Sequence, residues 1–333
     1  MSALSIKKPI RFNILKFLVT VFIAFLMVII VIYPDRYVQK CTDGIKLWAV
    51  SVLPSLLPFF FLTAILTKTE VLTKVFTKTD GVTRPLFNVS GVCLYAFAIS
   101  VLSGYPVGSK CTLDLFNAKT LSQGEAKRTG ILASTSGPLF VIGAVGTTMF
   151  NNKFYGLILY LVHIISAILT AITFKNYGEK STVLNKNINF KKCDNVLYES
   201  IYSSVISVLI VGGFIAVFYV ISSALFDFKV LTLPSNIINA IFSNFCSDNV
   251  GEGFVSGIIE CTKGCYILSS LPTSPITLSL CAYLISFGGI SIIMQSLVYL
   301  NKVGLKPSIF CLAKLTQATY SFVTALIIFS IIL

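Results

Sequence analysis

Charged residues are scarce in this chain. They make up 12% of its 333 residues, and 55% of the residues are hydrophobic. Soluble domains carry about 25% charged residues, so this composition excludes an ordinary soluble domain and predicts a polytopic membrane protein. The net charge of +13 does not indicate nucleic-acid binding, because the basic residues sit between hydrophobic runs, where they determine membrane topology.

Histidine and paired cysteines, which build many metal sites and catalytic centres, are also scarce. The only histidine, His163, lies in an apolar run, and the nine cysteines are scattered singly. Cys261 and Cys265 share one helix face, but a zinc site needs four clustered ligands, so the cysteines are predicted to be buried small hydrophobes. His163 is predicted to be a packing residue, with a proton relay as the alternative. Without a nucleophile–base set or a metal cluster, neither an enzyme nor a cofactor is expected.

The stretch SGYPVGSK, residues 103–110, looks like a phosphate loop but lacks its spacing. A phosphate loop has four residues between its glycines and a Ser or Thr directly after its lysine. Here three residues separate Gly104 from Gly108, and Ser109 precedes Lys110. The motif therefore does not indicate a nucleotide-binding protein.

Apolar runs predict the membrane-spanning helices, each of which needs about 20 residues. Two runs are interrupted and too short on either side to span. One extends from Val89 to Leu102 and breaks at residues 103–106, and the other extends from Ile237 to Ile267 and contains SDNVGEGFVSG. Both are predicted to be re-entrant helical hairpins. Seven further runs are long enough to span: 14–33, 45–66, 126–149, 154–174, 201–225, 276–299 and 308–333. The predicted fold class is an all-α polytopic membrane protein with about seven spanning helices and two hairpins.

The basic residues of the loops predict the orientation of the chain. The first run follows several lysines and an arginine, but no small-x-small cleavage site follows it, so it is predicted to be a retained helix with a cytoplasmic N-terminus. Lys119 and Lys186 are then predicted to face the cytoplasm, and Lys229 the opposite side. Counting the hairpins as full spans would break this alternation of charge.

An internal repeat is predicted from two similar stretches. SGYPVGSKC at Ser103 and SGIIECTKG at Ser256 both have Ser-Gly, four residues, Ser or Thr, and Lys, at an offset of 153 residues. The same offset carries run 45–66 onto 198–219 and run 154–174 onto 307–327. Each half then holds three crossings, so the halves insert in opposite orientations, which is the inverted-repeat architecture of secondary transporters. The predicted units are an N-terminal helix (1–40), a first repeat (41–180) and a second repeat (181–333).

The predicted substrate site lies where the interrupted helices meet near the middle of the membrane. Helices that restart after Gly104 and at Ser136-Gly137-Pro138 would direct free backbone N–H groups into a cavity, and Lys110 would add a full charge, so the site suits an anion. Gly288-Gly289 is the corresponding break in the second half. The candidate substrate-binding residues are Ser103, Gly104, Tyr105, Gly108, Ser109, Lys110, Ser136, Gly137, Glu260, Thr262, Lys263, Gly288, Gly289 and Gln295.

Structural roles compete with these assignments. Lys110 and Lys263 could instead pair with Asp114 and Glu260, because charges within membrane spans usually find partners. The stretch Ser122-x-x-Glu125 is predicted to be a capping box that begins the next helix. The prolines in LPSLLPFFF are predicted to kink a helix rather than to contact a ligand.

Four stretches identify a family resemblance that extends from about Gly44 to the C-terminus. LPSLLPFFFLTAIL, SGYPVGSK, TSGPLFVIGAVG and SFGGISIIMQS resemble the YlbJ-type sporulation integral membrane proteins, also called stage V sporulation protein V. The resemblance implies membership of the wider group with nucleoside-recognition Gate domains, which is similar to concentrative nucleoside transporters. It also implies transport of dipicolinic acid from the mother cell across the outer forespore membrane.

Dipicolinate is a planar pyridine that carries two carboxylates and is a dianion at neutral pH. Two helix N-termini and one or two lysines could neutralise it, and Tyr105 could stack on its ring. A nucleoside or other metabolite carrier of the same fold is the first alternative, and it predicts amides such as Gln295 and Asn249 in place of net positive charge. A non-transporting scaffold of a sporulation complex is the second. The expected partners are the bilayer and a small anion but no nucleic acid, and a homo-oligomer or sporulation membrane partners stay open.

Overall fold

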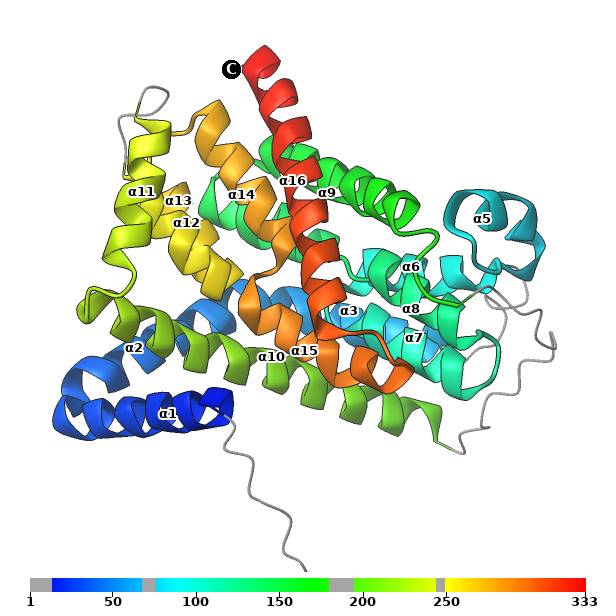
Figure 1. Cartoon of the computed structure of the whole chain (residues 1–333), viewed down its shortest axis with the longest axis horizontal. Helices are drawn as coiled ribbons and strands as arrows, with labels where there is room; N and C mark the ends of the chain where they lie inside the picture. The colour runs from blue at the N-terminus through cyan, green and yellow to red at the C-terminus, as the bar shows by residue number, and fades with distance from the viewer. Residues whose placement is uncertain (1–13, 68–75, 180–194, 244–248) are drawn as a thin grey trace, which may run out of the picture.

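The structure, a computed structural model, describes residues 14–67, 76–179, 195–243 and 249–333, and no strand occurs in these ranges (Figure 1). The first half contains α1 (Ile14–Ile32), α2 (Pro34–Leu47), η1 (Trp48–Val52), α3 (Leu53–Thr67), η2 (Thr77–Thr79), α5 (Asp80–Phe87), α6 (Val92–Ser103), α7 (Val107–Asn117), α8 (Gln123–Leu132), η3 (Leu139–Met149) and α9 (Lys153–Thr173). The second half contains α10 (Val196–Asp227), α11 (Thr232–Phe242), α12 (Val250–Ile259), α13 (Cys261–Ser269), α14 (Pro275–Phe287), α15 (Gly289–Leu300), η4 (Asn301–Val303) and α16 (Pro307–Ile332).

Four helical stretches in the described residues are long and apolar enough to cross a membrane: α9, α10, α14 continuing through α15, and α16. The number rises to six if two bent pairs each count as one span. These pairs are α1 with α2, bent by 108°, and α5 with α6, bent by 80°. The chain is therefore an all-α protein with four to six candidate spans, where the apolar runs alone predict about seven.

Two of the predicted spanning runs are broken helices. In run 126–149, α8 ends at Leu132, residues 134–137 are not helical, and η3 begins at Leu139 with a π-helical hydrogen-bond pattern. In run 276–299, Gly288 and Gly289 separate α14 from α15 and have φ values of 85° and 74°. Both interruptions fall at the predicted broken-helix signals, which confirms them.

The described part of the chain contains both predicted helical hairpins, but the second turns at a different residue from the one predicted. In the first, α6 packs against α7 around Gly104-Tyr105-Pro106. In the second, α12 packs against α13, and the chain breaks at Glu260. The predicted interruption SDNVGEGFVSG is wrong over Val250–Gly257, which is helical, and its first residues lie outside the described part of the chain. Its glycines remain helical because neighbours pack closely on them: a Cβ on Gly257, for example, would collide with Leu284 of α14.

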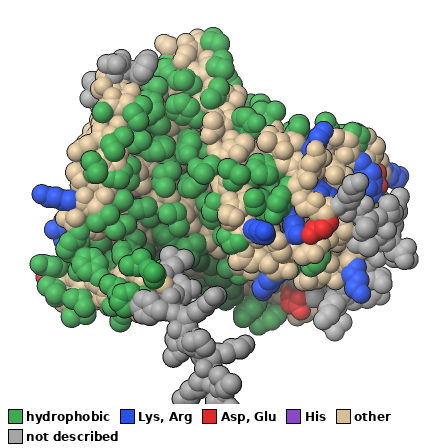
Figure 2. All heavy atoms as spheres, in the orientation of Figure 1, with side chains coloured by type: hydrophobic (Ala, Val, Ile, Leu, Met, Phe, Trp, Pro, Cys, Tyr) green, Lys and Arg blue, Asp and Glu red, His purple; other side chains and the backbone are tan. Residues whose placement is uncertain are grey.

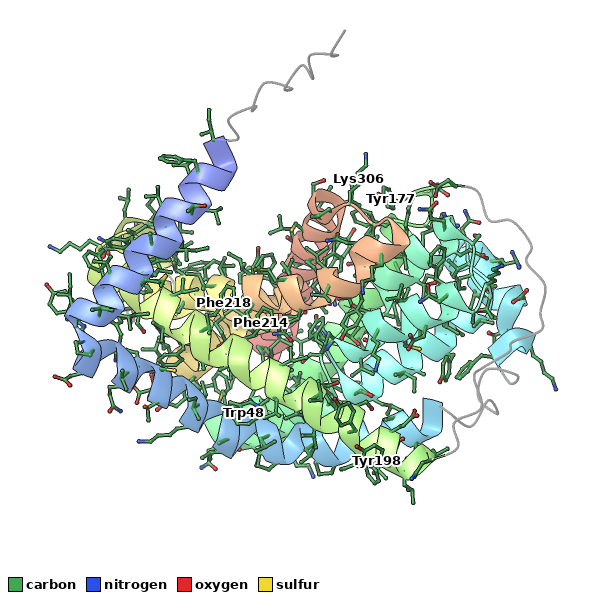
Figure 3. All side chains as sticks on the ribbon, turned by 90° about the horizontal axis from the view of Figure 1, so that it is seen from below. Trp48, Tyr177, Tyr198, Phe214, Phe218 and Lys306 are labelled. Atoms are coloured by element: carbon green, nitrogen blue, oxygen red, sulfur yellow. The ribbon has the colours of Figure 1, made fainter. Side chains whose placement is uncertain are left out.

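Packing between the halves brings the breaks together. The first-half helix α7 contacts α15 of the second half, and the second-half helix α13 contacts η3 of the first half. The long helix α10 runs beneath both halves and packs on α2, η1 and α3, with Trp48 against Gly212 (Figures 1 and 3). Each hairpin therefore touches the broken helix of the opposite half.

Local signals in the sequence are also found in the structure. Ser122 and Glu125 form the predicted capping box at the start of α8, with the Ser122 hydroxyl accepting the Glu125 backbone N–H. Pro58 lies inside α3, and the π-helical turn η1 directly precedes Leu53 and Pro54. In membrane helices, local π-helical adjustments can satisfy backbone groups that a proline leaves without a helical partner.

Several of the basic loops meet at one end of the molecule. Lys127 donates to the Glu179 carboxylate at 2.8 and 3.0 Å, and Arg128 donates to the carbonyls of Asn88 and Tyr177 at 3.0 and 2.8 Å. Charged side chains gather at the end where α5, α7 and α8 lie, and hydrophobic side chains cover much of the rest of this face (Figure 2). Tyr177 and Lys306 lie on the same side of the molecule (Figure 3).

Candidate substrate-binding cavity

Both hairpin turns and parts of both broken helices line one cavity. Its polar lining combines both hairpin turns with residues of the two broken helices, and its other walls are apolar. The polar and turn residues are Ser103, Gly104, Tyr105, Ser136, Gly137, Glu260, Thr262, Ser291 and Gln295, and the apolar residues are Val52, Leu56, Phe140, Val211, Ile215 and Ile292. Eight of the predicted site residues are among them: Ser103, Gly104, Tyr105, Ser136, Gly137, Glu260, Thr262 and Gln295.

Backbone contacts between the breaks give the cavity its shape. Gly104 has φ 80° and ψ −169°, a region that is essentially restricted to glycine. A Cβ at this position would also lie 2.6 Å from the backbone nitrogen of Gly137. In the second half, a Cβ on Gly289 would lie 3.0 Å from the Gly257 carbonyl oxygen and 3.1 Å from the Cys261 nitrogen. In each half, the hairpin turn therefore packs directly on the backbone of the broken helix.

His163 of α9 holds one of these breaks. Its Nε2 accepts the backbone N–H of Ser136 at 2.8 Å, and its Nδ1 lies 2.8 Å from the Ser286 hydroxyl of α14. Because Nε2 accepts, the ring proton is on Nδ1 and is donated to Ser286. The ring is fully buried, so His163 is the satisfied packing residue that the sequence predicts.

Glu260 places a carboxylate in the cavity lining. The residue is 1% exposed and is the N-cap of α13, where its side chain accepts the Lys263 backbone N–H at 2.7 Å. Thr262 also hydrogen-bonds to the carboxylate. A carboxylate is stabilised at a helix N-terminus by these donors and by the helix dipole. The Glu260 side chain thus occupies the N-terminus of α13, where an anionic ligand could otherwise bind.

The first turn of α7 does not supply lining residues. A Cβ on Gly108 would collide with the Ala133 carbonyl, and the buried Ser109 hydroxyl has no hydrogen-bond partner in the described part of the chain. Lys110 is partly exposed, and no salt bridge between described residues joins it to Asp114. None of the three predicted site residues Gly108, Ser109 and Lys110 is among the residues that line the cavity.

Lys263 points toward α10 rather than into the cavity. Its Nζ donates to the hydroxyls of Ser222 and Ser223 at 3.2 and 3.0 Å and lies 4.6 Å from the centroid of the Tyr219 ring. Glu260 binds its backbone N–H and forms no side-chain salt bridge with it among the described residues. Lys263 is therefore a buried cation held by hydroxyls and an aromatic ring.

The break at Gly288 and Gly289 acts on the cavity indirectly. Neither glycine is a lining residue, but α15 begins there and carries Ser291 and Gln295 into the lining. The Gln295 amide donates to the Ser291 hydroxyl at 3.4 Å. Asn249, the other amide that the sequence suggests for a nucleoside-type site, instead accepts from the Asn239 amide at 2.5 Å and is not a lining residue.

Lys314 is the charged residue that sequence reasoning missed. It lies in the first third of α16, is 1% exposed, and donates to the Tyr105 hydroxyl at 2.6 Å. It also donates to the Ser134 carbonyl at 3.0 Å and to Gln317 Oε1 at 2.7 Å. A lysine inside an apolar spanning run is the signal that could have identified it, because intramembrane charges are rare and mostly functional.

Fold and cavity together define a class: an all-helical polytopic membrane protein whose interrupted helices line a partly polar cavity. Within that class the chain is similar to the sporulation integral membrane protein YlbJ of Bacillus subtilis (strain 168), with 26% identity over 334 aligned residues, 93% of this chain and 82% of that protein. This homologue confirms the predicted relationship to the YlbJ-type sporulation integral membrane proteins. No protein-family model matches the chain, and no solved structure matches it.

Proposed function

We propose that the chain is a sporulation membrane transporter and that the cavity is its substrate site. The observation that carries this proposal is the convergence of both hairpin turns and parts of both broken helices on one cavity. Non-helical backbone at membrane depth is tolerated only where protein buries it or a cavity receives it. Secondary transporters bind their substrates where discontinuous helices meet. The B. subtilis homologue is a sporulation integral membrane protein, which supports the cellular setting.

The proposed architecture is the inverted repeat of the nucleoside-recognition Gate domain group. The order of elements supports it: a hairpin (α6–α7), a broken helix (α8–η3) and a long helix (α9) recur as α12–α13, α14–α15 and α16. The reciprocal contacts of α7 with α15 and of α13 with η3 support it further, because a pseudo-two-fold arrangement would produce such pairs.

Dipicolinate is the cargo that the family resemblance suggests. Tyr105 offers an aromatic face, and several hydroxyls and the Gln295 amide offer hydrogen bonds. A nucleoside or another polar metabolite is a second candidate, favoured by one observation: Glu260 and Gln295 line the cavity, and no lysine is among the lining residues in the described ranges. Transport assays therefore need both kinds of solute.

A deletion strain tests the cellular function. We expect its spores to lack dipicolinate while the mother cell retains it, and the wild-type gene to restore the spore content. Purified protein in vesicles should take up dipicolinate or a nucleoside. Loss of spore dipicolinate without uptake of either solute would favour the scaffold alternative.

A pair of cavity variants links uptake to the site. Leu56 lines the cavity and is 7% exposed, whereas Leu312 lies on the outer side of α16 and is 51% exposed. Leu56→Trp should fill the cavity and abolish uptake, and Leu312→Trp should retain it. Equal uptake by the two variants would mean that the substrate passes elsewhere.

The proposed orientation has a cytoplasmic N-terminus in the outer forespore membrane. The gathering of charged side chains at the end with α5, α7 and α8 supports it, because basic loops favour the cytoplasmic side (Figure 2). Single cysteines at Lys119 and Lys229, in a cysteine-free background, should be labelled from opposite sides. Labelling of both from one side would contradict the hairpin arrangement. Lys186, also predicted to be cytoplasmic, lies outside the described residues.

A further inference from the structure

The Lys314 ammonium is buried without a counter-charge. Its three N–H donors go to the Tyr105 hydroxyl, the Ser134 carbonyl and the Gln317 side-chain oxygen, all neutral acceptors. No salt bridge between residues that the structure describes involves it. Its hydrogen bonds are satisfied, but no described carboxylate pairs with it, and an ammonium that is buried without a counter-charge is costly. An anionic ligand group next to Tyr105 would supply the missing counter-charge.

Tyr105 connects this charge to the cavity. It lines the cavity, and the ammonium lies 4.8 Å from its ring centroid and donates to its phenolic oxygen. A phenolic oxygen that accepts a hydrogen bond still has its own O–H to donate. Donation from a cation polarises that O–H and strengthens its next hydrogen bond.

Ser103 is the second donor at the same turn. It lines the cavity two residues before Tyr105, is 1% exposed, and its Oγ is buried without a hydrogen-bond partner in the described part of the chain. Buried hydroxyls are nearly always hydrogen-bonded in folded proteins. An unpartnered hydroxyl in a cavity wall therefore points to a ligand atom that would pair with it.

We propose that the Tyr105 and Ser103 hydroxyls bind a carboxylate of the substrate and that Lys314 supplies the compensating charge through Tyr105. The proposal rests on the transporter function above and deepens it. Glu260 and Gln295 line the same cavity. The substrate class is accordingly a small organic acid that binds through one carboxylate at the Tyr105 turn, while its other polar groups meet Glu260 and Gln295. Lys314 is a positioning and polarising residue.

The test compares a charged and an uncharged ligand of one shape. Binding of pyridine-2,6-dicarboxylate and pyridine-2,6-dicarboxamide is measured by calorimetry on the purified full chain and on Tyr105→Phe, Lys314→Met and the double variant. Each single change should weaken dicarboxylate binding by about tenfold or more, since a hydrogen bond to a charged group is lost. The double variant should be no weaker than the weaker single one, because both act through one hydrogen bond. Diamide binding should change by less than about twofold.

Lys263→Met is the matched control, because Lys263 is also a buried lysine held by hydroxyls but does not line the cavity. It should leave the preference for the dicarboxylate unchanged. Tyr105→Phe keeps Lys314 and its two carbonyl acceptors. If this variant weakened the binding of the dicarboxylate and of the diamide equally, the role of Tyr105 would be purely structural and the inference would be overturned. Binding of the diamide alone by the wild type would also overturn it and leave the transporter intact. Failure to bind or transport dicarboxylate, diamide or nucleoside would overturn the proposed function as well.

Discussion

The two hairpin turns share a sequence pattern but bring different charges to the cavity. The first turn, Gly104-Tyr105-Pro106, contributes no acid, and the Lys314 ammonium from the other half supports it. The second turn is a single residue, Glu260, whose carboxylate caps α13. The shared pattern thus predicts the interruption only at the first turn, and it does not include the residue that gives each turn its charge. At the second turn this residue is Glu260, which lies in the variable spacer of the motif. At the first turn it is Lys314, which is 209 residues from Tyr105 in the sequence.

The glycines at equal positions of the repeated motif also differ in their surroundings. Gly104 has a positive φ and touches the Gly137 backbone, whereas Gly257 is part of the regular helix α12 and faces a leucine side chain. One glycine is required by backbone conformation and close backbone approach, and the other only by side-chain packing. Equal positions in a repeat therefore do not imply equal tolerance to substitution.

Gly104→Ala should have the largest effect of any single change at the turns. Its Cβ would be strained by the positive φ, at a cost of about 1–3 kcal/mol, and would also collide with the Gly137 nitrogen. We expect loss of transport and a marked fall in the melting temperature. Gly257→Ala is the comparison, since the Leu284 side chain can shift, and it should retain part of the transport. Equal damage from both changes would remove the distinction between the turns.

Glu260→Ala should rank second. The change removes the N-cap of α13, which costs about 0.5–2 kcal/mol, and it also removes the acid from the cavity. Transport should fall by about tenfold or more, as the loss of a hydrogen bond to a charged group implies. Ser274→Ala is the control, because it removes the N-cap of α14 and Ser274 does not line the cavity. It should lower the melting temperature to a similar extent without affecting transport. Similar transport in the two variants would assign Glu260 to stability alone.

The lysines of the repeated motif should matter less. Lys110 and Lys263 occupy equal positions in the two copies of the motif, in α7 and α13, but neither lines the cavity. We expect Lys110→Ala and Lys263→Met to change the affinity for pyridine-2,6-dicarboxylate by less than about twofold. A tenfold loss in either variant would place a ligand-binding cation at that position and restore the interpretation that the sequence pattern suggests.

The sequence predicts the breaks better than the charges. Glycines, prolines and short apolar runs are local signals, so the first hairpin turn and both broken helices are predicted at their observed places. The second turn is misplaced because Gly251, Gly253 and Gly257 suggest a break, whereas tertiary packing keeps them helical. The approach of Lys314 to Tyr105 depends on how the two halves interlock, and no local pattern encodes it.

The junction of the basic loops is the contact between Lys127 and Glu179, and it is not part of either turn. Its removal should have the smallest effect on stability and transport among the changes considered. The hydrogen bond from Lys127 lowers the pKa of the Glu179 carboxyl, which is 60% exposed. A carboxyl whose pKa is lower in the folded state stabilises the fold above its unfolded value, about 4.3, and that stabilisation is lost as the pH falls through the folded value. Exposed pairs contribute less than about 1 kcal/mol, so the melting temperature of the wild type should exceed that of Glu179→Gln slightly at neutral pH and converge with it on acidification. Transport at neutral pH should be unchanged in the variant. A difference that persists at low pH would mean that packing, not the charge, holds this junction, and a loss of transport would mean that the junction is coupled to the turns.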